Sequence, residues 1–128
     1  MAQEPATIDS VMNLAEALTN MDGDTELLQE IIGVFMQTGP GQLETLGNCI
    51  AAGAVQDVAI TAHGMKGGAS NFCARRFVAA ALQLELLAKG GTLEGAAPRL
   101  EAMKAAFAEL QELVGLINWE EVAQNWKV

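Results

Sequence analysis

Apolar residues recur every three or four positions along most of the chain, and this spacing places them on one face of an α-helix. The spacing is clearest in two stretches, where the steps alternate regularly between three and four residues, as in the contact seam of a helical bundle. The two stripes comprise Val55, Val58, Ala62, Met65, Ala69 and Phe72, and Leu100, Met103, Phe107, Leu110, Val114 and Ile117. No useful stretch alternates with a period of two, so strands are not expected.

Breaks in this pattern divide the chain into six predicted helices. The first carries Ile8 to Leu18, MDGD follows it, and Asp24 is positioned to cap the second. We interpret TGPG at 38–41 as the end of the second helix and the beginning of a third, because Pro40 suits the first turn of a helix.

The remaining breaks are short and rich in glycine. AAG at 51–53 ends the third helix, Gly90-Gly91 ends the fifth, and the sixth begins near residues 95–98. The sequence therefore predicts an all-α fold. We expect an antiparallel up-down four-helix bundle from the third to sixth helices, with two additional N-terminal helices covering one end.

The length suits a single domain over residues 1–128, with a C-terminal extension at 118–128. Trp119, Val122, Ala123 and Trp126 are spaced to share one face of a short helix in that extension. This face either caps the end of the bundle or contacts a partner.

Charge restricts the class of partner. The chain has 16 acids against 7 bases, a net charge of −9, and no Lys or Arg before Lys66. Such a chain repels phosphate backbones and anionic lipids, so neither nucleic acid nor a membrane surface is expected as a partner. The acidic half, residues 1–65, is either a solvated surface or a docking surface.

Cysteine and histidine are too few to suggest a metal site. Cys49 and Cys73 are far apart and there is one histidine, so we expect no metal and two buried thiols in a reducing cytosol. MAQEPATIDS has neither the basic start nor the apolar stretch of a signal peptide, and no apolar run is long enough to span a bilayer. We therefore expect a cytoplasmic protein and a monomer, and Met1 with the early start of the first helix favours a freestanding chain.

The single histidine lies in the segment AHGMKGG at 62–68. His63 is one residue, or about 100°, away from the core stripe of its helix, so it points outward with Lys66, Gly67 and Ser70 on the same strip. An exposed imidazole beside a cation can accept a phosphoryl group. Each glycine costs a helix about 1 kcal/mol, and its missing side chain leaves room for an incoming protein.

The segment TAHGMKGGASNFCARRFVAAALQLELLAKGG resembles the histidine-containing phosphotransfer (HPt) domain family, and the resemblance covers about residues 8–117. The family signature runs Ala-His, an apolar residue, Lys-Gly, a later apolar residue, Gly-Ala, and a helix ending in Leu-Glu. This chain matches it at Ala62, His63, Met65, Lys66, Gly67, Phe72, Ala74, Leu84 and Glu85. It departs at Cys73, where the family usually has glycine, which puts a left-handed turn there in doubt.

The resemblance implies a phosphorelay protein that takes a phosphoryl group from a receiver-domain aspartate onto His63 and passes it to another receiver. It implies that Lys66 steadies the phosphoryl oxygens and that Gly64, Gly67 and Gly68 admit the receiver. Ser70 either bonds near the imidazole or is merely exposed, and Arg75 and Arg76 either meet the receiver or balance local charge. The two arginines fit the second role better.

The partners that follow are response-regulator receiver domains and a hybrid histidine kinase. The receiver would hold Mg²⁺ and the catalytic machinery, so this chain is expected to be a carrier with no cofactor and no ATP site, not an enzyme. A helical adaptor without phosphoryl chemistry remains the alternative. A histidine-kinase dimerisation helix fits less well, because Gly64 stands where an acid typically follows the histidine.

Overall fold

The computed structural model describes residues 11–125, which form six helices and no strand. This confirms the predicted all-α class. The helices are α2 (Leu14–Asn20), α3 (Thr25–Ala51), α4 (Val55–Ser70), α5 (Arg75–Lys89), α6 (Ala96–Gly115) and α7 (Trp119–Asn125).

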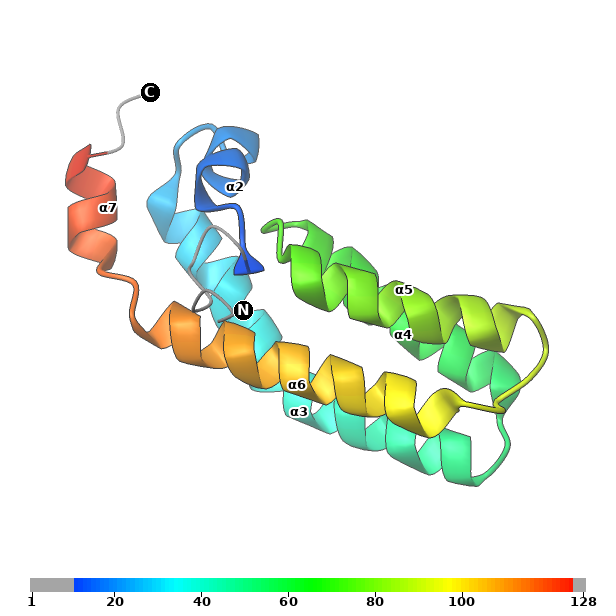
Figure 1. Cartoon of the computed structure of the whole chain (residues 1–128). Coiled ribbons are helices and arrows are strands. Elements are labelled where there is room, and N and C mark those ends of the chain that lie inside the picture. The colour runs from blue at the N-terminus through cyan, green and yellow to red at the C-terminus, as the bar shows by residue number, and fades with distance from the viewer. Residues whose placement is uncertain (1–10, 126–128) are drawn as a thin grey trace, which may run out of the picture.

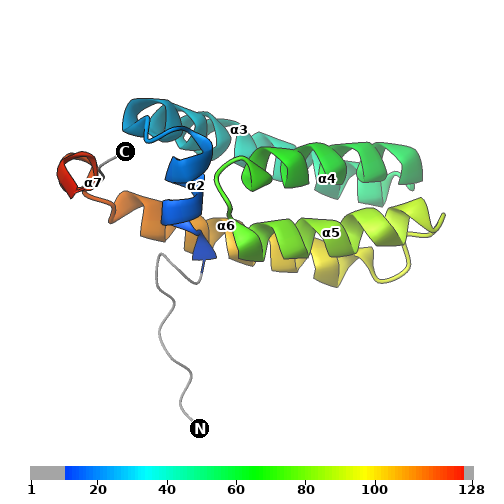
Figure 2. The same cartoon turned by 90° about the horizontal axis from the view of Figure 1, so that it is seen from above.

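Four long helices make up most of the molecule and run in alternating directions (Figure 1). The helix α4 packs against α3 and α5, and α6 also packs against α3 and α5. The N-terminal half of α3 extends past the other three helices, and α2 and α7 pack against this helix at that end (Figures 1 and 2). The site-bearing helices α4 and α5 are therefore held side by side on one face of the molecule.

Aromatic residues from four segments meet in the core between these helices. Phe35 of α3 lies with its ring centroid 5.3 Å from Phe72, 5.2 Å from Phe77 and 5.7 Å from Phe107. All four side chains are buried, and the contacts with Phe72 and Phe77 are edge-on, the geometry that aromatic pairs prefer. These rings join α3, α5 and α6 to the end of α4.

The prediction that TGPG separates two helices is wrong, because α3 continues through Pro40 as a single helix of 27 residues. The helix forgoes the hydrogen bond of the missing proline N–H, and Thr38 Oγ1 donates to the Val34 carbonyl at 3.0 Å one turn earlier. Gly39 is buried against α6: a Cβ atom there would lie 2.3 Å from Phe107 Cε2. The segment is therefore a close-packing site between two helices.

This correction also changes the predicted N-terminal arrangement. The predicted second and third helices are the two halves of α3, so one short helix, α2, accompanies the extended end of α3 among the described residues. Asp24 caps α3 as predicted, since its carboxylate accepts the Leu27 N–H at 2.9 Å. Ile8, the predicted start of the first helix, lies outside the described residues.

The turn between α4 and α5 keeps the left-handed conformation that Cys73 placed in doubt. Cys73 has a φ of +57°, and the Ala74 N–H donates to the Ala69 carbonyl at 3.1 Å to close the end of α4. The Cys73 carbonyl in turn accepts the Asn13 N–H at 3.0 Å, which links the turn to α2. Burial and the nearby Glu16 carboxylate raise the pKa of the Cys73 thiol, so the thiol form predominates there.

At the C-terminal end, α7 packs against α3 with Trp119 and Val122 half-buried, as the capping interpretation expects, whereas Ala123 is exposed. Trp126 lies outside the described residues. None of the helices between residues 11 and 125 combines the length and apolar character that a bilayer crossing requires.

Candidate functional site

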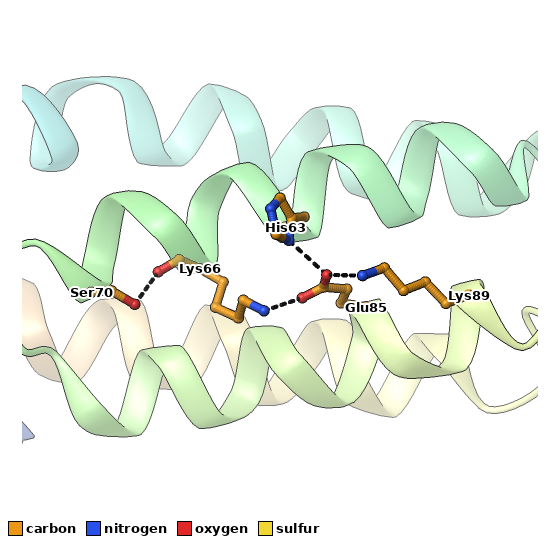
Figure 3. A network of polar contacts seen from close by, with 5 residues as sticks. All are labelled: His63, Lys66, Ser70, Glu85 and Lys89. Atoms are coloured by element: carbon orange, nitrogen blue, oxygen red, sulfur yellow. Dashed lines mark hydrogen bonds and ion pairs between the residues drawn. The ribbon is translucent and has the colours of Figure 1, made fainter.

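His63 projects from the middle of α4 toward α5, with 63% of its side chain exposed (Figure 3). The predicted outward position follows from the neighbouring core stripe, since Ala62 and Met65 on either side are buried. The Nδ1 atom of the imidazole lies 2.7 Å from Glu85 Oε2 on α5. The ring is therefore anchored through one nitrogen.

Glu85 is the centre of the cluster and the one charged residue that is buried in the described part of the chain, with 1% of its surface exposed. Lys66 Nζ lies 2.7 Å from Oε1, and Lys89 Nζ lies 2.7 Å from Oε2 (Figure 3). Together with His63, these two lysines cover the carboxylate on its solvent side. A single buried anion thus collects an imidazole and two cations from α4 and α5.

The charge state of Glu85 follows from two opposing effects. Burial alone raises the pKa of a carboxyl group. The hydrogen bonds from Lys66, Lys89 and His63 have the opposite and larger effect, so the pKa of Glu85 falls from its ordinary 4.5 to about 2. Glu85 is accordingly ionised at neutral pH and can only accept hydrogen bonds. The proton of the 2.7 Å contact therefore belongs to His63 Nδ1, which leaves the lone pair of a neutral imidazole on Nε2.

The three glycines around His63 have different surroundings. A Cβ atom at Gly64 or Gly67 would meet nothing within 4 Å, so neither glycine is required by packing inside the domain. A Cβ atom at Gly68 would lie 3.4 Å from the Phe35 ring. Gly64 and Gly68 line an open groove of about 490 Å³ between α3 and α4, which begins one residue from the imidazole.

The other predicted site residues make local contacts. Ser70 Oγ donates to the Lys66 carbonyl at 2.8 Å, and Figure 3 shows Ser70 on the far side of Lys66 from His63. Arg75 pairs with Glu16 at 3.3 Å, and Arg76 pairs with Glu109 at 2.8 Å. These pairs agree with the expectation that the arginines balance local charge.

Sequence analysis missed the role of Glu85 and did not single out Lys89. Glu85 entered only as half of a Leu-Glu pair in the family signature. The available signal was the spacing of Glu85 and Lys89, an i, i+4 pair on one helix. The pairing of that acid with His63, 22 residues earlier, depends on how α4 packs against α5.

This arrangement suits nucleophilic attack by Nε2. The imidazole is exposed, and its hydrogen bond to Glu85 fixes its tautomer. The ammonium groups of Lys66 and Lys89 contact the same carboxylate, so both lie close to an anion that approaches the ring. No cluster of three or more His, Cys, Asp or Glu side chains suited to a metal ion occurs between residues 11 and 125. The chemistry that the cluster favours is transfer of an anionic group to and from nitrogen.

Comparison with known proteins identifies the class. A family model of the Hpt domain matches residues 30–113, more than half of the 128-residue chain. The chain therefore belongs to the Hpt domain family, whose members carry phosphoryl groups in phosphorelays, and the resemblance noted in the sequence is confirmed.

A solved structure shares the fold. The crystal structure of histidine-containing phosphotransfer protein B (HptB) from Pseudomonas aeruginosa PAO1 matches with a TM-score of 0.74 and 23% sequence identity. The match covers 91% of this chain and 97% of that chain. The search of curated proteins found no match.

Proposed function

We propose that this protein is a phosphorelay carrier that accepts a phosphoryl group on His63 Nε2 from a receiver-domain aspartate and passes it to the aspartate of another receiver. The observation that carries the proposal is the 2.7 Å contact between Nδ1 and the ionised Glu85, because it directs the lone pair of an exposed imidazole outward. Membership of the Hpt domain family supports the same chemistry.

In the proposed transfer, the Nε2 lone pair attacks phosphorus and forms a P–N bond, while the P–O bond to the receiver carboxylate breaks. The imidazole gains positive charge as the bond forms, and Glu85 offsets that charge through the Nδ1 hydrogen bond. In the second transfer, the aspartate carboxylate of the next receiver attacks phosphorus and forms a P–O bond, while the P–N bond breaks and its electron pair goes back to Nε2. Glu85 holds the Nδ1 proton in both transfers.

Lys66 and Lys89 supply the positive charge that a phosphoryl group requires. Both are paired with Glu85, and their side chains are 25% and 57% exposed. Because each ammonium group sits on a flexible four-carbon chain, it can turn from Glu85 toward phosphoryl oxygens when they arrive. Hydrogen bonds to charged groups are worth about 1.5–3 kcal/mol each, enough to affect the transfer rate measurably.

Gly64, Gly67 and Gly68 give the receiver access to His63, and exposed Ser70 provides a polar docking contact one turn beyond Lys66. The open space at Gly64 and Gly67 supports this assignment, since neither glycine serves packing within the domain. We further propose that Mg²⁺ belongs to the receiver, and that this chain has no ATP site and acts in the cytoplasm as a monomer.

Phosphorylated receiver domains from the source organism provide the test. Incubation with a cognate receiver should label the wild-type chain with acid-labile, base-stable phosphate. His63→Gln should abolish the label without changing the helical circular dichroism, because the side chain is exposed and outside the core. Label that survives the substitution would refute His63, and absence of wild-type label with every receiver would favour a helical adaptor.

A further inference from the structure

The groove between α3 and α4 has an apolar wall that is open to solvent. Its α3 wall presents Leu27 and Val34 with 41% and 54% of their surfaces exposed, and Ile31 lies between them on the same face. Leu27, Ile31 and Val34 are spaced i, i+4 and i+7, so they form a single apolar row along α3. An exposed apolar ridge beside an open groove is typical of a surface that binds another protein.

The α4 wall of the groove is smooth because two glycines stand one turn apart. Gly64 and Gly68 expose the backbone of α4, and a side chain at Gly64 would project into open space. A helix presents side chains in ridges that fit such a channel between two other helices. The groove therefore fits an amphipathic helix lying beside α3, with its apolar face toward Leu27, Ile31 and Val34.

The edge of the groove carries one kind of charge. Glu30 is the single charged residue that lines it, and among the described residues Glu30 forms no ion pair. Glu26, one turn earlier on α3, is also exposed, and no Lys or Arg precedes Lys66. On the α5 side of His63 the charge is reversed, since Lys66 and Lys89 flank the imidazole.

The face around His63 is thus acidic and apolar on one side and cationic on the other. We propose that the groove selects receivers whose docking helix has an apolar face bordered by a Lys or Arg that meets Glu30, so that Glu30 determines partner specificity. The proposal rests on the phosphorelay function above and adds the charge of the partner. Charge at the rim of an interface acts mainly on the association rate and on which partners bind.

The test compares Glu30→Lys with Glu44→Lys, using the receiver that phosphorylates the wild-type chain fastest. Both glutamates are exposed residues of α3 and both substitutions change the net charge equally, but Glu44 does not line the groove. Initial transfer rates are measured against receiver concentration at low and at high salt. Circular dichroism checks that both variants fold.

We expect Glu30→Lys to raise the KM for the receiver about tenfold at low salt and to leave the saturating rate within about twofold, because an exposed charge acts on the encounter. The effect should shrink at high salt, and Glu44→Lys should stay within about twofold of wild type. Glu30→Gln, which only removes the charge, should raise KM about threefold. Should Glu30→Lys not fold, the Glu30→Gln result decides.

Equal KM values for Glu30→Lys and Glu44→Lys would overturn the proposal, whether both rise or neither does. Such a result leaves the phosphorelay function intact, since wild-type transfer is the reference in every comparison. Absence of transfer to the wild-type chain is a separate outcome, and it would overturn both proposals together.

Discussion

One carboxylate defines the state of the histidine. Glu85 is ionised, accepts the hydrogen bond from Nδ1–H and thereby leaves the lone pair of a neutral imidazole on Nε2, while it holds two lysines beside the ring. An ionised carboxylate next to imidazole also stabilises the positive charge that develops during transfer. In the proposed transfer, the same residue therefore both joins α4 to α5 and determines which nitrogen of His63 reacts.

Glu85 should contribute to stability in a defined range of acid pH. Its folded pKa of about 2 lies below its ordinary 4.5, so its contribution is present above pH 4.5 and is lost as the pH falls toward 2. The difference in unfolding free energy between wild type and Glu85→Gln should therefore shrink across this range. Denaturant unfolding followed by circular dichroism at each pH measures it.

The exposed Glu44, which is in no ion pair among the described residues, provides the control for that series. Glu44→Gln should show little pH-dependent difference from wild type. A constant difference between wild type and Glu85→Gln down to about pH 2 would contradict the ion-pair cluster. At neutral pH, Glu85→Gln should also slow phosphoryl transfer roughly tenfold, the lower range for removing an orienting partner of a histidine.

The residues of the site could be predicted from sequence only where they share one helix. His63 and Lys66 are three positions apart on α4, so helical spacing places them together. Glu85 and Lys89 come from α5, and nothing in the local pattern states which turn of α5 faces His63. Burial of Glu85 at 1% exposure results from that helix pairing, which no single stretch of sequence encodes.

At the scale of helices, the apolar stripes predicted α4, α5 and α6 well. Glycine also marks two of the breaks, since Gly53 precedes α4 and Gly90-Gly91 follow Lys89 at the end of α5. The TGPG segment was wrongly predicted to separate two helices, because glycine and proline usually mark helix ends. Here a tertiary contact outweighs local propensity: the Phe107 ring occupies the space beside Gly39. Gly39 is consequently a packing contact between α3 and α6 inside one continuous helix.

Two glycine substitutions separate packing from access. Gly39→Ala should destabilise the domain by about 1–3 kcal/mol, because its Cβ atom would lie 2.3 Å from the buried Phe107 ring. Gly67→Ala meets nothing within 4 Å and should stabilise the domain by up to about 1 kcal/mol through helix propensity. Thermal and denaturant unfolding measure both. A loss of stability in Gly67→Ala similar to that in Gly39→Ala would show that Gly67 also belongs to the packed interior.

At the scale of the whole molecule, packing and charge together orient the proposed encounter. The helices α4 and α5 hold the cationic cluster, and the N-terminal half of α3 forms the acidic and apolar wall beside it. From the net charge of −9 we could only exclude classes of partner, because a net charge does not show where the charged residues lie around His63. The helix packing places opposite charges on the two sides of His63.

The central claim is that Nε2 of His63 carries the phosphoryl group while Glu85 holds the Nδ1 proton. Nuclear magnetic resonance of the receiver-phosphorylated chain, labelled with ¹⁵N in histidine and observed with ³¹P, tests it directly, since His63 is the single histidine. We predict a ³¹P–¹⁵N coupling to Nε2 and a protonated Nδ1, both absent from His63→Gln. Phosphorus coupled to Nδ1, or phosphate on any other residue, would contradict the account.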